Sequence, residues 1–312
     1  MDNMDNILFV PATRELEWVQ DVLPGTSPAE LPVAGRRVID YAVERAQKFG
    51  VMFTEILDWN FSQRLADDFA DMTRTGFPVF YMKGEGPVPR GLRDIEGYSS
   101  PLTSDITDGL VVVWGVALST HTAADVSLEP ISDEECVETP AGIYRRKDGR
   151  WMRIVPHGLV VRSVKAWHAL NFTVLRNPGE FTLPGYSSER DAYIGRNVVL
   201  EHGTSVKPPV LLQNNTWFAR NVVLDGDVIV DSGSFVSEGA HLRRTVVCRD
   251  TFIGPGLDFD GKIVVGRRVV DADSGTWVDL EEPGLARQIP AGLGWIRSLW
   301  HFIRGRSFGR RG

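Results

Sequence analysis

The sequence predicts an α/β domain followed by a parallel β-helix of about four coils. Up to about residue 178, short apolar runs alternate with amphipathic helical segments. From Ile194 to Cys248, an apolar residue returns at every sixth position. Neither a helix nor a strand has this period, but β-helices do. We therefore expect an α/β domain over residues 1–178, a β-helix over 179–282 and a basic amphipathic tail over 283–312.

Composition limits the class of protein. The chain has 312 residues with 43% hydrophobic and 24% charged residues, typical of a globular protein. A net charge of −7 argues against a nucleic-acid partner. The two cysteines, Cys136 and Cys248, are too few for a disulfide framework or a metal cluster. The acidic N-terminus lacks an apolar signal core, and no stretch is apolar enough to span a bilayer, so we expect a cytoplasmic protein.

The first domain is predicted to consist of strands that alternate with helices. A hairpin should turn at Asp148-Gly149, between two β-rich runs. Elsewhere, apolar runs predict buried strands at 7–10, 52–57, 79–82 and 110–118, and helical spacing predicts helices at 36–49, 62–73 and 164–175. This alternation favours a parallel sheet covered by helices.

The repeat predicts the core of the β-helix. Its main series consists of Ile194, Leu200, Val206, Leu212, Phe218, Leu224, Val230, Val236, Leu242 and Cys248. A series of smaller residues follows four positions later, and Gly, Asn, Asp or Pro stands between the two. We expect one residue to be lost near Asp250 and the ladder to resume at Ile253, which gives 13 hexads. Three hexads per coil give about four coils.

The tail changes character after Glu282, with six arginines and no acidic residue. Leu293, Ile296, Leu299, Trp300 and Ile303 belong to a wide apolar face. Residues 291–304 could make a peripheral contact with anionic lipid at the inner membrane face. Alternatively, they could cover the open end of the β-helix or bind a partner subunit.

Two segments resemble a known family. Residues 31–41, Leu-Pro-Val-Ala-Gly-Arg-Arg-Val-Ile-Asp-Tyr, are similar to L-P-V-x-G-[RK]-P-[IL]-[IL]-x-Y, and residues 167–171, Trp-His-Ala-Leu-Asn, to Y-L-x-A-N. Both patterns occur in the sugar-nucleotide pyrophosphorylases, nucleotidyltransferases that carry a C-terminal left-handed β-helix. The resemblance implies a Rossmann-like nucleotidyltransferase domain and a left-handed coil, whereas parallel crossovers are otherwise right-handed.

The implied chemistry is attack of a sugar phosphate on the α-phosphorus of a nucleoside triphosphate. It calls for a glycine-rich loop, cationic side chains and Mg²⁺ held by carboxylates. Where the family has G-G-x-G-T-R-L, this chain keeps Thr13 and Arg14 as nucleotide-binding candidates but has no glycine. Pro28 stands near the position of the family's lysine, while Val116 and Val160 stand at its two metal-binding aspartates.

These departures predict that ordinary Mg²⁺-dependent pyrophosphorylase chemistry is lost. Residues that could substitute, as catalytic candidates beside Arg14, are Asp105, Asp108 and His121, near the relevant strand. Alternatively, these three residues are solvated loop residues without a catalytic role. If activity is retained, Mg²⁺ is the expected cofactor; apart from that we expect no cofactor and no protein-bound metal.

A second enzyme class also uses hexapeptide β-helices, the acyltransferases that consume acyl-CoA. Their general base is a histidine, and the candidates here are His202 and His241, neither of which falls in an inward series.

The sequence therefore predicts a nucleotidyltransferase-like protein of sugar-nucleotide or surface-polysaccharide metabolism that acts as a binding, regulatory or scaffold subunit. The alternative is an active transferase with a rewired site. Expected partners are a nucleotide or sugar nucleotide and a second copy of the chain or another protein.

Overall fold

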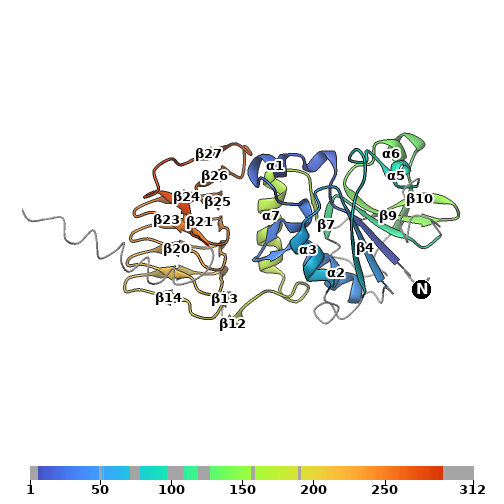
Figure 1. The fold of residues 1–312 in the computed structure, drawn as a ribbon. Helices are drawn as coiled ribbons and strands as arrows, with labels where there is room; N and C mark the ends of the chain where they lie inside the picture. The colour runs from blue at the N-terminus through green and yellow to red at the C-terminus, as the bar shows by residue number, and fades with distance from the viewer. Residues whose placement is uncertain are drawn as a thin grey trace, which may run out of the picture. The chain divides into compact units, whose positions relative to one another are not determined.

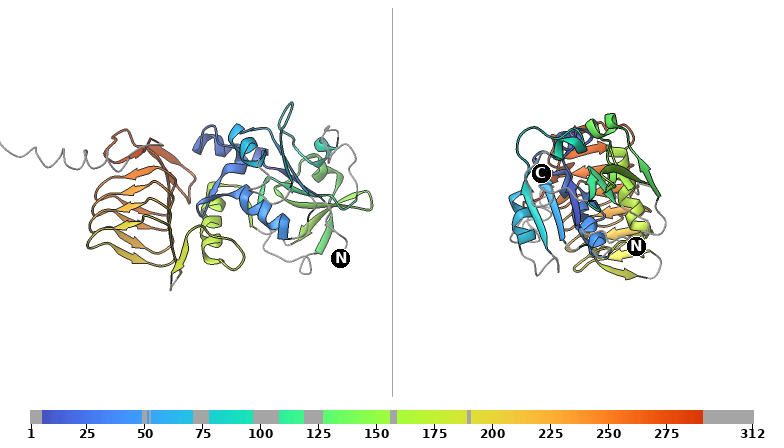
Figure 2. Two further views of the ribbon diagram at one scale, coloured as in Figure 1. Left: turned by 60° about the horizontal axis from the view of Figure 1, so that its bottom comes forward. Right: turned by 90° about the vertical axis from the view of Figure 1, so that its right-hand side faces the viewer.

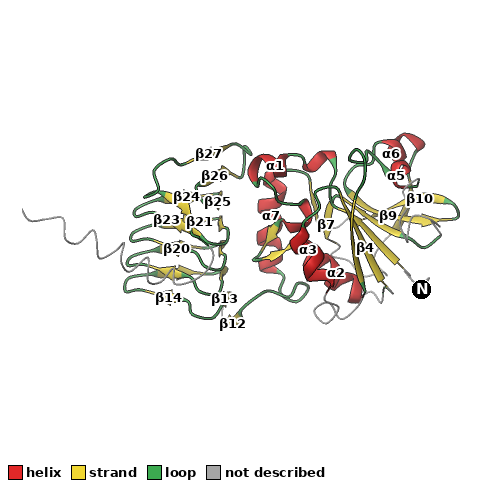
Figure 3. Ribbon diagram, viewed as in Figure 1, coloured by secondary structure: helices red, strands yellow, loops and turns green. Residues whose placement is uncertain are grey.

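A computed structural model describes residues 6–48, 51, 53–70, 78–96, 108–118, 127–155, 159–188 and 191–290. The chain forms two compact units, Met1–Leu183 with Ala272–Gly275, and Pro184–Asp271 with Thr276–Gly312 (Figure 1). Within the described residues, helices occur only in the first unit, and the second consists of short strands and turns (Figure 3).

The first unit is built on a seven-stranded mixed sheet in the order β5-β4-β1-β6-β9-β10-β8. Four strands are parallel: β1 (Asn6–Val10), β4 (Phe53–Asp58), β5 (Val79–Lys83) and β6 (Val111–Trp114). The other three are antiparallel: β9 (Gly142–Lys147), β10 (Arg150–Val155) and β8 (Ser127–Pro130). The predicted α/β arrangement is therefore confirmed, with an antiparallel extension on one side.

The helices of this unit follow the apolar spacing of the sequence. α2 (Val38–Lys48), within the helix predicted over 36–49, buries Val38, Ile39, Ala42 and Ala46. α3 (Gln63–Ala70) buries Leu65 and Phe69. α7 (Val164–Arg176) begins at Ser163, whose hydroxyl accepts a hydrogen bond from the Ala166 N–H. The remaining described helices are short: α1 (Trp18–Val22), α5 (Leu92–Ile95), α6 (Asp133–Val137) and the 3₁₀ turns η1 (Arg14–Leu16) and η2 (Pro28–Glu30).

Two turns in this unit depend on positive backbone angles. Asp148 and Gly149, with φ of 50° and 70°, join β9 to β10 as the sequence predicts. Gly115, with φ of 74°, breaks the single strand predicted over 110–118 into β6 and β7 (Val116–Leu118). A Cβ at Gly115 would lie 2.9 Å from the Cβ of Ala141, so a larger residue does not fit. β7 leaves the main sheet and pairs with β11 (Leu159–Val161).

The second unit contains three stacked sheets of short parallel strands, an arrangement compatible with a β-helix (Figure 2). Each parallel strand pairs with the strand that comes three strands later along the chain. Leu212 of β16, for example, lies opposite Val230 of β19, eighteen residues later. The parallel strands form the series β13-β16-β19-β22-β25 (Ala192–Ile194, Val210–Leu212, Val228–Val230, Thr245–Val247, Lys262–Val265), β14-β17-β20-β23 (Val199–Leu200, Trp217–Phe218, Phe235–Val236, Thr251–Ile253) and β15-β18-β21-β24 (Ser205–Lys207, Val223–Asp225, His241–Arg243, Asp258–Asp260).

From Val206 to Leu242 the inward series packs as predicted. At its start the prediction is wrong, because Ile194 and Leu200 lie outside the central cluster and Leu200 is 44% exposed. After Leu242 the register changes earlier than predicted. Val230 pairs with Val247, seventeen residues on, so the missing residue lies between Leu242 and Val247 and not near Asp250. Val247 belongs to the central cluster, whereas Cys248, predicted as a core member, is the buried residue that follows it. A second shortening makes Val264 the core residue in place of Val265. Arg244 and Gly261 take the positive φ angles at these two corners.

Antiparallel strands close the stack at both ends. β12 (Tyr186–Ser188) pairs with β13, and β26 (Arg268–Asp271) and β27 (Trp277–Asp279) follow β25. β28 (Ala286–Gln288) pairs with β23, so the stack includes residues beyond the predicted boundary at 282. The predicted contact segment 291–304 lies outside the described residues.

Candidate functional site

In the sheet of the first unit, the strand order reverses at β1, because later strands are added on both sides of it. β4 and β5 follow β1 on one side, whereas β6 pairs with β1 on the other. In open α/β sheets, ligands bind outside the carboxyl ends of the strands at such a switch point. The candidate site is therefore the edge where β1 ends at Val10 and β6 ends at Trp114.

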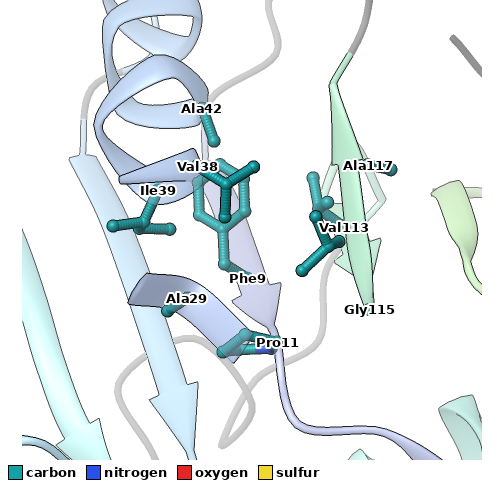
Figure 4. A pocket seen from close by; sticks show the side chains of 10 residues that line it. Phe9, Pro11, Ala29, Val38, Ile39, Ala42, Val113, Gly115 and Ala117 are labelled. Atoms are coloured by element: carbon teal, nitrogen blue, oxygen red, sulfur yellow. The ribbon is translucent and has the colours of Figure 1, made fainter. Parts of the chain in front are cut away.

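A pocket lies at this switch point and is lined by apolar residues (Figure 4). Phe9 and Val113 come from the two strands, Val38 and Ile39 from α2, and Pro11 from the turn after β1. Ala29, Ala42, Gly115, Val116 and Ala117 complete the lining. Its cavity volume is about 10 Å³, close to the space that one water molecule needs. None of the described residues that line it has a charged or hydrogen-bonding side chain, so these side chains offer no ligand to a metal ion and no partner to a phosphate.

Of the three positions at which the resemblance implies a charged residue, two are buried beside this pocket. Val116 is 3% exposed and lines it directly, while Pro28 is buried at the start of η2, next to the lining residue Ala29. Val160 is partly exposed in β11, opposite Ala117. Apolar packing therefore occupies the place where the resemblance would put a lysine and a metal-binding carboxylate.

The segment after β1, where the resemblance implies a phosphate loop, has one buried hydroxyl. Thr13 is 5% exposed, and its Oγ1 makes no hydrogen bond to any described residue. It lies beside the turn at Gly115, at 3.5 Å from where a Cβ would stand. Arg14, the other nucleotide-binding candidate, is exposed at the start of η1.

Arg162, a cation that the sequence analysis does not identify, lies near this segment. Arg162, directly after β11, is 3.2 Å from the carboxylate of Glu15 and donates a hydrogen bond to the Ala141 carbonyl at 2.8 Å. Glu15 also accepts a hydrogen bond from the Ala141 N–H at 3.3 Å. The charge of Arg162 is thus partly neutralised. No local sequence pattern marks it, because its neighbours come from distant segments.

β4 ends at Asp58, a buried carboxylate that the sequence analysis does not identify. Asp58 accepts hydrogen bonds from the hydroxyls of Ser27 and Tyr81 and from the Asn60 N–H. Burial raises the pKa of Asp58 above its ordinary value, against the effect of these hydrogen bonds. The signal for it was an acidic residue directly after the buried pair Ile56-Leu57. Because its oxygens already accept three hydrogen bonds, we assign it the role of holding η2 and β5 to the sheet edge.

The two segments that carry the family resemblance contact each other. Asn171, 1% exposed in α7, accepts a hydrogen bond from the Ala34 N–H at 2.8 Å. Trp167 donates from its indole N–H to the Pro32 carbonyl at 2.7 Å. Ala34 and Gly35, with φ of 40° and 75°, form the turn between β2 (Pro32–Val33) and β3 (Arg36–Arg37). The α7 motif therefore fixes the hairpin that leads into α2.

Of the predicted substitute residues Asp105, Asp108 and His121, the structure describes Asp108 alone, and Asp108 lies away from the pocket. Asp108 precedes β6, so it lies at the amino end of that strand, at the opposite edge of the sheet from the pocket. It accepts a hydrogen bond from the Gly149 N–H at 3.0 Å. Asp105 and His121 lie outside the described residues.

The two histidines of the acyltransferase alternative lie in separate strands and turns of the second unit. His202 is exposed in the turn after β14. His241, in β21, lies between two carboxylates, with Nε2 3.8 Å from Asp225 and Nδ1 3.6 Å from Asp258. Its Nε2 is buried and makes no hydrogen bond within the described part of the chain.

Comparison of the chain with protein-family models and with curated proteins found no match. No group of three or more His, Cys, Asp or Glu residues placed to hold a metal ion occurs among the described residues. Of the helices that the structure describes, none has the length and apolar character needed to cross a membrane.

Proposed function

We propose that this chain is a nucleotidyltransferase-like protein of sugar-nucleotide or surface-polysaccharide metabolism that has lost ordinary pyrophosphorylase chemistry. It acts as a binding, regulatory or scaffold subunit. In this proposal, the first unit is a Rossmann-like nucleotidyltransferase domain, and the stacked sheets are a left-handed parallel β-helix of about four coils.

The apolar pocket at the switch point carries the proposal. A triphosphate brings several negative charges, which need cations, a metal ion or backbone N–H groups. Here the lining is apolar, with Val116 and Ala29 in it and Pro28 beside it. Placing a triphosphate there would desolvate its charges without compensation, which is unfavourable.

The contact between α7 and the hairpin after β2 supports the family part of the proposal. The two motifs lie 137 positions apart at Ala34 and Asn171, yet they join through buried hydrogen bonds. This contact preserves the architecture around the site while the charged residues are missing. Such a combination suits a subunit that is retained for binding and assembly.

The acyltransferase alternative has less support. A general base must present a nitrogen to the acceptor group. The Nε2 of His241 is buried, and both ring nitrogens face carboxylates of the same sheet. His202 is an exposed turn residue with no neighbouring feature that argues for catalysis.

An activity assay tests the proposal. The full-length protein is incubated with Mg²⁺, each common nucleoside triphosphate and a panel of sugar 1-phosphates, and pyrophosphate release is measured. The proposal predicts release no faster than in the protein-free control. Release that saturates with one nucleotide–sugar pair, and that is lost in Arg14→Ala or Arg162→Ala, would establish an active rewired site instead.

A further inference from the structure

The β14-β17-β20-β23 sheet has a column of large apolar side chains on its outward face. Val199, Trp217, Phe235 and Phe252 occupy equivalent positions on successive strands. The residues after them, including Phe218, Val236 and Ile253, point into the central cluster. Because successive residues of a strand face opposite sides, this aromatic column faces away from the core.

The rings of the aromatic column form a continuous stack. The ring centroids of Trp217 and Phe235 are 6.3 Å apart, and those of Phe235 and Phe252 are 5.6 Å apart with nearly parallel planes. Beside this ridge, two residues further along the strands, lie the small residues Ala219, Ser237 and Gly254. Near Phe252 this row is already covered, because the Leu285 carbonyl accepts a hydrogen bond from the Gly254 N–H. The open part of the face therefore lies beside Trp217 and Val199.

The chain itself returns to one end of this column. β28 pairs with β23, and the guanidinium of Arg287 lies 5.0 Å from the centre of the Phe252 ring. Ile289 is buried in one cluster with Phe235 and Phe252. At the other end, Trp217 is only partly buried, and Val199 is 37% exposed. Ile289 therefore lies at the end of the column that contains Phe235 and Phe252.

The residues that follow have the spacing to continue along it. Leu293, Ile296, Leu299, Trp300 and Ile303 fall on one side of a helix. Eleven residues of helix, from Leu293 to Ile303, span about 16 Å. From Phe235, where Ile289 already packs, two steps between neighbouring strands lead to Val199, or about 10 Å. A helix over this segment is therefore long enough to cross the open part of the column, and its apolar side suits packing there.

We propose that residues 293–304 form an amphipathic helix that docks on the aromatic column of their own chain. Only residues 290–292 separate this segment from Ile289, so the local concentration of the segment at the column far exceeds that of a second copy. The helix runs from the Phe235 end toward Val199, which brings Arg304 near Glu201. That carboxylate already accepts a hydrogen bond from the Trp217 indole N–H at 3.1 Å. The helix then covers the exposed apolar end of the face.

Trypsin cleavage of the full-length protein tests this docking, because arginines lie both in the helix and beyond it. Docking predicts cleavage after Arg297 at least about tenfold slower than after Arg310 or Arg311, which serve as internal controls. Rates are followed by intact-mass spectrometry. Cleavage after Arg297 as fast as after Arg310 would overturn the proposal.

Matched variants locate the docking face. Trp217→Ala, in the column, should remove most of the protection of Arg297, whereas Trp277→Ala, on the exposed strand β27, should leave it unchanged. In the tail, Ile303→Asp on the apolar side should release Arg297, and His301→Asp, on the opposite side of the helix, should not. Equal behaviour within both pairs would contradict the assignment, and the tail pair cannot be explained by misfolding of the column.

Two other occupants give distinct results in the same assay. Protection by a second copy rises with protein concentration and coincides with a dimer in light scattering. Protection by a membrane appears only when anionic phosphatidylglycerol vesicles are added. Either result would refute docking within one chain, which requires protection that is independent of concentration and present without lipid.

Discussion

The side-chain oxygen of Asn171 accepts a hydrogen bond from the backbone N–H of Ala34 at 2.8 Å. The same amide donates to the Trp167 carbonyl at 2.9 Å. Since Asn171 is 1% exposed, water cannot replace these bonds. This one side chain thus connects α7 to a turn whose Ala34 has a φ of 40°, an angle uncommon for residues other than glycine.

We expect Asn171→Leu to lower the free energy of unfolding by about 1–3 kcal/mol, because the buried Ala34 N–H loses its partner. Asn177→Leu is the matched control, since its amide also donates to the carbonyl four residues earlier but is exposed. It should cost less than about 1 kcal/mol. Urea unfolding of the two variants checks this, and equal losses would contradict a buried linking role.

Leu224→Asp should be severely destabilising. Leu224 is fully buried in the central cluster of the second unit, so a carboxylate there would have no partner. We expect a loss of roughly 4 kcal/mol or more. Val278→Asp, at a position 55% exposed on β27, should change stability by less than about 0.5 kcal/mol. A melting temperature of Leu224→Asp equal to that of the wild type would rule out the inward series.

Asp231 makes stability depend on pH. This carboxyl is 6% exposed, and burial raises its pKa to about 6, partly offset by Arg249. A raised folded-state pKa favours the folded state when the carboxyl is protonated. Its contribution is therefore fully present below pH 3.8, the unfolded value, and is lost as the pH rises through about 6.

Asp231→Asn should remove this dependence. At pH 8 the variant should be more stable than the wild type by up to about 3 kcal/mol, and the advantage should disappear near pH 4. Glu238→Gln, at an exposed position, should show no such trend. Denaturant unfolding at several pH values measures the difference. A wild type that is more stable than Asp231→Asn at pH 8 would contradict the raised pKa.

Thr13→Val tests whether the hydroxyl beside the pocket has a use in the free protein. Its Oγ1 is buried without a hydrogen bond to a described residue, so replacing it by a methyl group should be neutral or stabilising by about 1 kcal/mol. Thr216→Val is the contrast, because that buried hydroxyl donates to the Gln213 carbonyl at 2.8 Å. It should lose about 1 kcal/mol. Equal destabilisation of both variants would indicate a hidden partner of Thr13.

The sequence could predict most elements because their signals are local. The six-residue spacing predicted the inward positions from Val206 to Leu242, and Asp148-Gly149 predicted the hairpin between β9 and β10. The shortened corner was misplaced because Val247 and Cys248 are both apolar. Only the pairing of Val247 with Val230 distinguishes them.

The candidate site could be predicted only in part. Val116 and Pro28 were recognisable because a motif fixed their positions. Arg162 and Asp58 were not, since their partners lie far away in the sequence, as Ser27 does for Asp58. Asp108 was proposed as a substitute from its nearness in sequence to β6, but it stands at the amino end of that strand, which a linear distance does not reveal.

Isothermal titration of the full-length protein with nucleoside triphosphates, with and without Mg²⁺, tests the central claim most directly. Because none of the described residues that line the switch-point pocket is charged, we predict no binding that depends on Mg²⁺. Saturable triphosphate binding that requires Mg²⁺ and is weakened in Arg14→Ala would contradict the loss of pyrophosphorylase chemistry.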